Sequence, residues 1–154
     1  MVALTPFHRQ TVPRAELAEV LSDDGTVRLV IPPNTLSNDA VVSIQQTGSG
    51  SLGQGRLMRV GPAYQVSLST GQEALNGSAF LYMYYDLDMD RVLTPTLRIH
   101  RWDAVGQTWV PLASTVDGGQ SMVRAEVNHL SVFALFGEAA PAQRLHLPVV
   151  VKRF

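Results

Sequence analysis

Short runs in which apolar and polar residues alternate recur along this chain, and they narrow its fold more than any other feature. One such run has apolar side chains at Tyr64, Val66 and Leu68, with polar residues between them. A period of two sends alternate side chains to opposite faces of a β-strand, so each run predicts a strand with one buried face. Asp-Gly, Asn-Gly and Pro-Pro pairs bound the runs, as turns do in β-sandwiches. The sequence therefore predicts an all-β fold, an antiparallel β-sandwich with little helix.

The pattern also predicts individual elements. Strands are expected at Thr26–Ile31, Ala40–Thr47, Ala63–Ser69, Ser78–Tyr85, Thr96–Asp103, Thr108–Leu112, Met122–Val127 and Val132–Phe136. Asn76-Gly77 predicts a turn, and residues 14–21 fit either a helix or a strand. Trp102 and Trp109 are expected to lie across from each other in a hairpin. The predicted core comprises Tyr64, Val66, Leu68, Trp102, Trp109, Val132 and Phe133.

Length and composition limit the number of domains and exclude several classes of protein. The 154 residues suit one domain, and a formal net charge of -1 provides no basic field for nucleic acid. There is no cysteine, which excludes disulfides and thiolate sites, and no apolar run is long enough to span a membrane. We expect residues 1–14 to form a leader or linker, residues 15–137 the domain, and residues 138–154 a linker with a short apolar tail. The first ten residues lack the apolar core of a secretory signal, so we expect a piece of a longer chain.

The segment Asn128-His129-Leu130-Ser131 carries the most distinctive chemistry. It joins two predicted strands without a glycine or proline to ease the turn. The Ser131 hydroxyl directly follows the Leu130 carbonyl and can attack it through a five-membered ring, while His129 is close enough in sequence to take the proton. The product of this N-to-O acyl shift is an ester that water hydrolyses. The sequence therefore predicts self-cleavage between Leu130 and Ser131, provided that the fold strains the amide or stabilises the oxyanion.

Two other interpretations of these residues remain open. In an intact structural or protein-interaction module, Leu130 is core, and His129 and Ser131 only satisfy the amides of the turn. In a multi-turnover hydrolase, Ser131 needs an acid that orients His129, and the nearest acids before it in sequence are Asp117 and Glu126. Neither acid is clearly placed for that role, so the hydrolase has the least support.

The sequence contains only weak indications of a metal-binding site. Asp86, Asp88 and Asp90 stand at every second position, which fits either a calcium site or a solvated strand end. No glycine or distal glutamate completes a known calcium loop. The remaining histidines stand on separate predicted elements: His8, His100 and His146. We therefore expect no metal and no cofactor.

Several segments in order resemble the ZU-five domain, the type named from zonula occludens proteins and netrin receptors. These are Asp24–Leu36 with its Ile-Pro-Pro-Asn-Thr-Leu turn, Gly61–Tyr64, Tyr84–Asp86, the Trp102–Trp109 hairpin, and Asn128–Leu135. The resemblance covers roughly residues 15–137 and implies a β-sandwich. Some ZU-five domains cut themselves at a His-apolar-Ser turn. The resemblance thus implies that Ser131 is the nucleophile, Leu130 the scissile carbonyl and His129 the base.

The end of the chain suggests a location and a partner. Residues 144–152 are similar to the Leu-Pro-Val-rich tails that close some bacterial surface proteins. We therefore expect an extracellular parent chain, although a cytoplasmic location stays open. After a cut, the partner would be the chain's own C-terminal fragment, held without a covalent bond. Other domains or proteins are possible partners, and nucleic acid is not expected.

Overall fold

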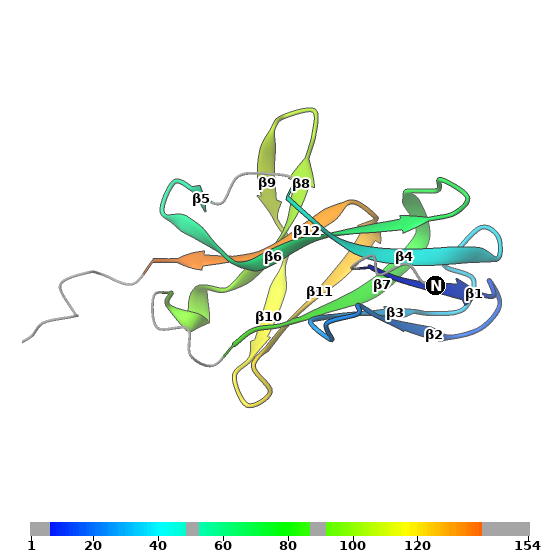
Figure 1. Ribbon diagram of the computed structural model, residues 1–154, viewed down its shortest axis with the longest axis horizontal. Helices are drawn as coiled ribbons and strands as arrows, with labels where there is room; N and C mark the ends of the chain where they lie inside the picture. The colour runs from blue at the N-terminus through cyan, green and yellow to red at the C-terminus, as the bar shows by residue number, and fades with distance from the viewer. Residues whose placement is uncertain (1–6, 49–52, 87–91, 140–154) are drawn as a thin grey trace, which may run out of the picture.

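The computed structural model describes residues 7–48, 53–86 and 92–139 as two antiparallel sheets packed face to face (Figure 1). The first sheet runs in the order β1 (Phe7–Val12), β4 (Ala40–Thr47), β6 (Leu57–Leu68), β12 (Val132–Glu138), β8 (Arg98–Asp103) and β9 (Thr108–Pro111), with β5 (Gly53–Gln54) also paired to β6. The second runs in the order β10 (Ser114–Asp117), β11 (Met122–His129), β7 (Ala74–Tyr84), β3 (Val27–Ile31) and β2 (Ala18–Leu21). A single 3-10 turn, η1 (Thr94–Thr96), is the one helical element in these ranges, and no helix there has the length and apolarity to cross a membrane. The predicted all-β antiparallel sandwich is confirmed.

Alternation in the sequence becomes alternation in burial. In β3, Val27, Leu29 and Ile31 are buried while the residues between them are partly exposed. The main core cluster includes four of the seven residues predicted for the core, Tyr64, Val66, Leu68 and Phe133, and a fifth, Trp109, is buried in a separate, smaller cluster with Ala63, Ala134 and Phe136. The other two, Trp102 and Val132, are only partly buried and pack against a smaller cluster around Trp109. Trp102 and Trp109 do pair across the β8–β9 hairpin, with ring centroids 5.2 Å apart.

The structure differs from the sequence prediction at the first strands and at one turn. Residues 7–12, expected in a leader, form β1, which pairs with β4 along its whole length. Residues 14–21, which fitted either a helix or a strand, contain the strand β2 and no helix. Asn76-Gly77 is not a turn: it lies inside β7, where Gly77 has φ 140°. That angle belongs to the region that glycine tolerates best, so the pair bends a long strand instead of ending it.

A polar cluster around Asp24 links the two sheets. Asp24 lies in the turn between β2 and β3, and its carboxylate accepts hydrogen bonds from Gln46 Nε2 on β4 (3.0 Å) and from the Tyr64 hydroxyl on β6. The Thr26 amide and the Ser22 hydroxyl donate to the same carboxylate. Burial alone raises the pKa of Asp24, but these hydrogen bonds to the charged form outweigh it and lower the pKa from 3.8 to about 2.

This lowered pKa predicts an acid-sensitive contribution to stability. A folded pKa below the unfolded value means that Asp24 stabilises the fold above about pH 4, and that this contribution disappears as the pH falls towards about 2. Urea unfolding of wild type and Asp24→Asn at pH 7 and pH 2.5 should show a larger loss for the wild type. Glu126→Gln, which removes an exposed carboxylate on β11, should retain the wild-type loss. Equal losses in wild type and Asp24→Asn would contradict this account.

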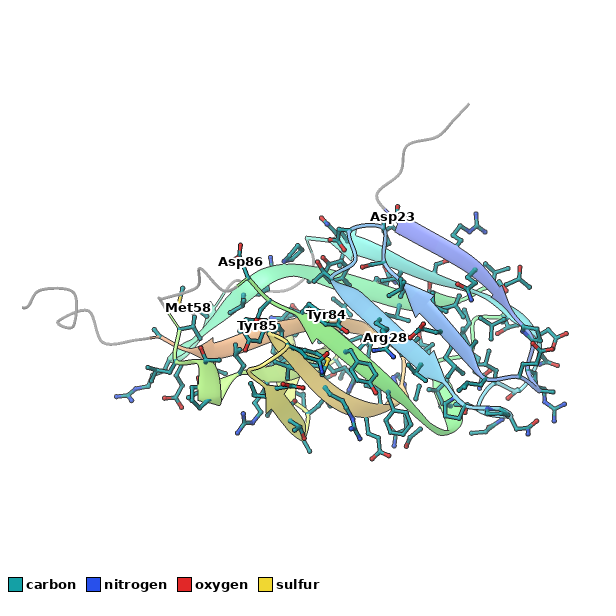
Figure 2. The ribbon with its side chains drawn as sticks, turned by 90° about the horizontal axis from the view of Figure 1, so that it is seen from below. Asp23, Arg28, Met58, Tyr84, Tyr85 and Asp86 are labelled. Atoms are coloured by element: carbon teal, nitrogen blue, oxygen red, sulfur yellow. The ribbon has the colours of Figure 1, made fainter. Side chains whose placement is uncertain are left out.

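The outer face of the second sheet carries a second charged cluster. Figure 2 shows Arg28 on β3 beside Tyr84 on β7. Hydrogen bonds from Arg28 to Glu19 of β2 and to Tyr84 raise the pKa of the guanidinium. Arg28 also stacks over the Tyr82 ring at 4.6 Å. These contacts tie β2 to β3 and β7 of its sheet.

Candidate functional site

The His-Leu-Ser segment is the crossover between the two sheets. β11 ends at His129 in the second sheet, where it pairs with β7, and β12 begins at Val132 in the first sheet, between β6 and β8. Figure 1 shows the yellow-orange chain leaving one layer and entering the other at this point. Leu130 and Ser131 are therefore the whole connection. The sequence predicted a tight link between two core strands, and the structure adds that these strands do not pair with each other.

Hydrogen bonds fix the crossover on both sides. The Leu130 amide donates to the Glu73 carbonyl (2.8 Å), and the Ser131 carbonyl accepts from the Val66 amide (2.9 Å). The Leu130 side chain is 3% exposed and belongs to the main core cluster. The Ser131 hydroxyl donates to the Trp102 carbonyl of β8 at 3.1 Å. The peptide bond between Leu130 and Ser131 is thus anchored to both sheets.

His129 has an unusual environment at its two ring nitrogens. Its side chain is 43% exposed, and Nε2 lies 3.9 Å from Oε1 of Glu73. Nδ1 is buried and has no hydrogen-bond partner in the part of the chain that the structure describes. A buried polar atom without a partner costs about 1–3 kcal/mol, which makes such atoms rare in folded proteins. An unpaired imidazole nitrogen beside a hydroxyl-bearing turn therefore calls for a chemical explanation.

The acid beside His129 is one that the sequence analysis missed. Asp117 and Glu126 were the acids considered from the sequence, yet the carboxylate that lies near the His129 ring is that of Glu73. Glu73 precedes β7, and the pairing of His129 with Ala74 brings it opposite Leu130. A register shift in β11 between Val127 and His129 sets this alignment. The shift leaves residues 75–78 of β7, which include Asn76-Gly77, opposite Asn128 alone. That pair was the signal of the shift in the sequence, but it predicted a turn and so gave no indication of Glu73.

An open cleft of about 480 Å³ lies along the crossover. His129, Leu130 and Ser131 all line it, together with residues from β6, from the β6–β7 loop and from the β8–β9 hairpin. Its charged lining residues are Glu73, Arg101 and Asp103. Since one water occupies about 30 Å³ in the liquid, the cleft has room for the water that an ester hydrolysis consumes. The structure thus brings together all three residues that the sequence selected, at a place that solvent reaches.

The resting geometry lacks two features of a site poised to react. Within the described ranges, no hydrogen bond joins the His129 ring to the Ser131 hydroxyl, and no donor reaches the Leu130 carbonyl oxygen. Leu130 and Ser131 are also absent from the described residues with positive φ. The crossover therefore lacks the backbone strain that positive φ would signal.

The metal signals find no support in the described residues. No three His, Asp or Glu side chains there come together as a metal site. His100 is 2% exposed and packs on Phe136, with its Nδ1 against the Arg98 carbonyl; burial lowers its pKa, so it is a core histidine. His8 lies on β1. Asp88, Asp90 and His146 lie outside the described residues.

Fold and site together define an all-β, two-sheet antiparallel protein with a His-Leu-Ser crossover between its sheets. No protein-family profile and no curated protein sequence matches the chain. The resemblance to the ZU-five domain therefore stays a prediction from the sequence.

Proposed function

We propose that this chain is a ZU-five-like module that cuts its own Leu130–Ser131 bond once and keeps both pieces in one sandwich, as part of a bacterial surface protein. The observation that carries the proposal is the buried, unpartnered Nδ1 of His129, two residues from a serine at the same crossover. A base without a hydrogen bond keeps its lone pair available for a proton. The surface assignment rests on the tail sequence alone.

The reaction uses groups that the crossover already holds. Ser131 Oγ attacks the Leu130 carbonyl carbon and gives its proton to His129, forming a tetrahedral oxyanion. The carbon–nitrogen bond then breaks, and His129 returns the proton to the Ser131 nitrogen, which leaves an ester between Leu130 and Ser131 and a free amine. Water from the cleft hydrolyses the ester to a Leu130 carboxylate and the Ser131 hydroxyl. No proton or electron is needed from elsewhere.

Two steps set the rate in this geometry. Ser131 must first leave the Trp102 carbonyl, at a cost of about 1 kcal/mol for one hydrogen bond. The oxyanion must then be stabilised by water in the cleft, because no described donor reaches the Leu130 oxygen. Losing one preorganised donor slows acyl transfer by about 10²–10³-fold. We therefore expect slow cleavage, over hours to days, rather than cleavage during folding.

Hydroxylamine tests the ester intermediate. Because it attacks esters much faster than amides, it should accelerate the cut in the folded protein and leave a hydroxamate on Leu130. Asn76-Gly77 is a second hydroxylamine-sensitive bond, so the fragments must be identified by mass. The expected C-terminal piece begins at Ser131, and urea-denatured protein should not produce it. A reagent effect confined to Asn76-Gly77 would contradict the acyl shift.

The second candidate is an intact structural or protein-interaction module. Its support is the hydrogen bond from the Ser131 hydroxyl to the Trp102 carbonyl, which gives the hydroxyl a structural partner. In this case the crossover joins the two sheets through Leu130, Ser131 and Val66, and the chain stays whole. The same hydroxylamine experiment separates the two candidates, because an intact module yields no fragment that begins at Ser131.

A further inference from the structure

We propose that Glu73 is a positioning residue for His129: its carboxylate holds the imidazole proton on Nε2 and so leaves the lone pair on Nδ1. The role of this arrangement in cleavage rests on the proposed function, but the arrangement itself does not. The Leu130 amide donates to the Glu73 carbonyl at 2.8 Å, and Ala74 pairs with His129. The backbone of Glu73 is therefore fixed against the crossover, although its side chain is 72% exposed.

The two ring nitrogens independently favour the same tautomer. A neutral imidazole carries one N–H donor and one lone-pair acceptor. The Glu73 carboxylate accepts hydrogen bonds only, and it faces Nε2, so it favours the proton there. Nδ1 is buried without a hydrogen-bond partner among the described residues, so a proton on Nδ1 would be an unpaired buried donor. Both effects place the proton on Nε2.

The distance leaves room for a closer contact. At 3.9 Å, Nε2 and Oε1 are beyond hydrogen-bond range. The exposed glutamate side chain needs a movement of only about 1 Å to reach it. When His129 takes the Ser131 proton it becomes positively charged, and the carboxylate then stabilises the imidazolium, as the acid does in a serine triad. Glu73 thus acts through His129: its carboxylate makes no hydrogen bond to Leu130 or Ser131 within the described residues, and only its main-chain carbonyl contacts Leu130.

Nitrogen NMR of the imidazole tests the arrangement without cleavage. The Ser131→Ala protein, labelled with ¹⁵N-histidine and held at alkaline pH, should show His129 with a protonated Nε2 and an unprotonated Nδ1. Adding Glu73→Ala should move both ring nitrogen shifts towards the average of free imidazole. Adding Glu126→Ala, which removes an exposed carboxylate three residues before His129, should leave them unchanged. A His129 ring protonated on Nδ1, or equal spectra for the two glutamate variants, overturns the proposal.

Cleavage kinetics test the consequence. With Ser131 present, Glu73→Ala should slow the cut about 10-fold, a part of the 10²–10⁴-fold that a positioned base contributes. Glu73→Gln keeps an acceptor oxygen without the charge and should fall between wild type and Glu73→Ala, while Glu126→Ala should cleave as wild type does. A wild-type protein that never cuts overturns the proposed function, and the NMR result still decides the Glu73 contact. Cleavage of Glu73→Ala at the wild-type rate overturns the positioning role alone.

Discussion

Ser131→Ala leaves the chain whole under denaturing conditions, however long the folded protein is aged at neutral pH, whereas the wild type accumulates two fragments. The substitution removes the only hydroxyl that can reach the Leu130 carbonyl through a five-membered ring, so the expected effect is complete loss of the cut. A denaturing gel sampled over several days measures it. The variant should still fold, since it loses one hydrogen bond, Ser131 Oγ to the Trp102 carbonyl, at a cost of about 1 kcal/mol.

Two further variants make this result specific. Ser67→Ala removes another serine hydroxyl from the lining of the same cleft and should cleave at the wild-type rate. His129→Ala should slow the cut by about 10²–10⁴-fold, the contribution of a positioned base. Fragments from Ser131→Ala, or loss of cleavage in Ser67→Ala, would assign the cut to a contaminating protease or to a general effect on the cleft.

Phe136→Ala should destabilise the sandwich more than Ser131→Ala or His129→Ala does. Phe136 lies on β12 in the middle of the first sheet, is 0% exposed, and packs against Trp109 and His100, with ring centroids 5.1 Å and 4.9 Å away. Replacing a buried phenylalanine with alanine costs about 3–5 kcal/mol, because it removes apolar contacts and leaves a cavity. Urea unfolding of the Ser131→Ala protein with and without this change measures the difference without interference from cleavage.

The same substitution tests how a cut chain stays together. After cleavage, β12 belongs to the C-terminal piece and remains paired with β6 and β8. Wild-type fragments should therefore co-elute in native size exclusion, and Phe136→Ala should release the C-terminal piece. Val105→Ala is the matched control, because Val105 is 97% exposed and its loss should change stability by less than about 0.5 kcal/mol. Equal stabilities for the two variants would contradict the packing described for β12.

The alternation of apolar and polar residues predicted the fold because every second side chain of a strand in a sandwich faces the core. Val66 and Leu68 stand two residues apart and both face the core, as the sequence predicted. Prediction failed where tertiary context overrode local composition. Asn76-Gly77 is a strong turn signal, but it lies inside β7, at the irregularity between the two stretches that pair with β11. Residues 7–12 had no clear period, and their strand exists because β4 offers an edge to pair with.

The site was predictable only in part, for a related reason. His129, Leu130 and Ser131 are adjacent in sequence, so the acyl shift that they could perform can be predicted from the residues alone. Glu73 is far away along the chain, and its place beside His129 depends on the register of β7 against β11. The hydrogen bond from Ser131 to Trp102 likewise depends on β8 pairing with β12. Contacts that depend on strand register, rather than on local sequence, were the ones missed.

The mass of the folded, aged wild-type protein under denaturing conditions tests self-cleavage most directly. Purified protein is kept at neutral pH, denatured, and analysed by intact mass spectrometry beside Ser131→Ala. The account predicts two wild-type masses, Met1 to Leu130 with a free carboxylate and Ser131 to Phe154 with a free amine, which sum to the full chain plus one water. A single wild-type mass equal to that of the uncut chain would contradict self-cleavage and leave the intact module as the function of this fold.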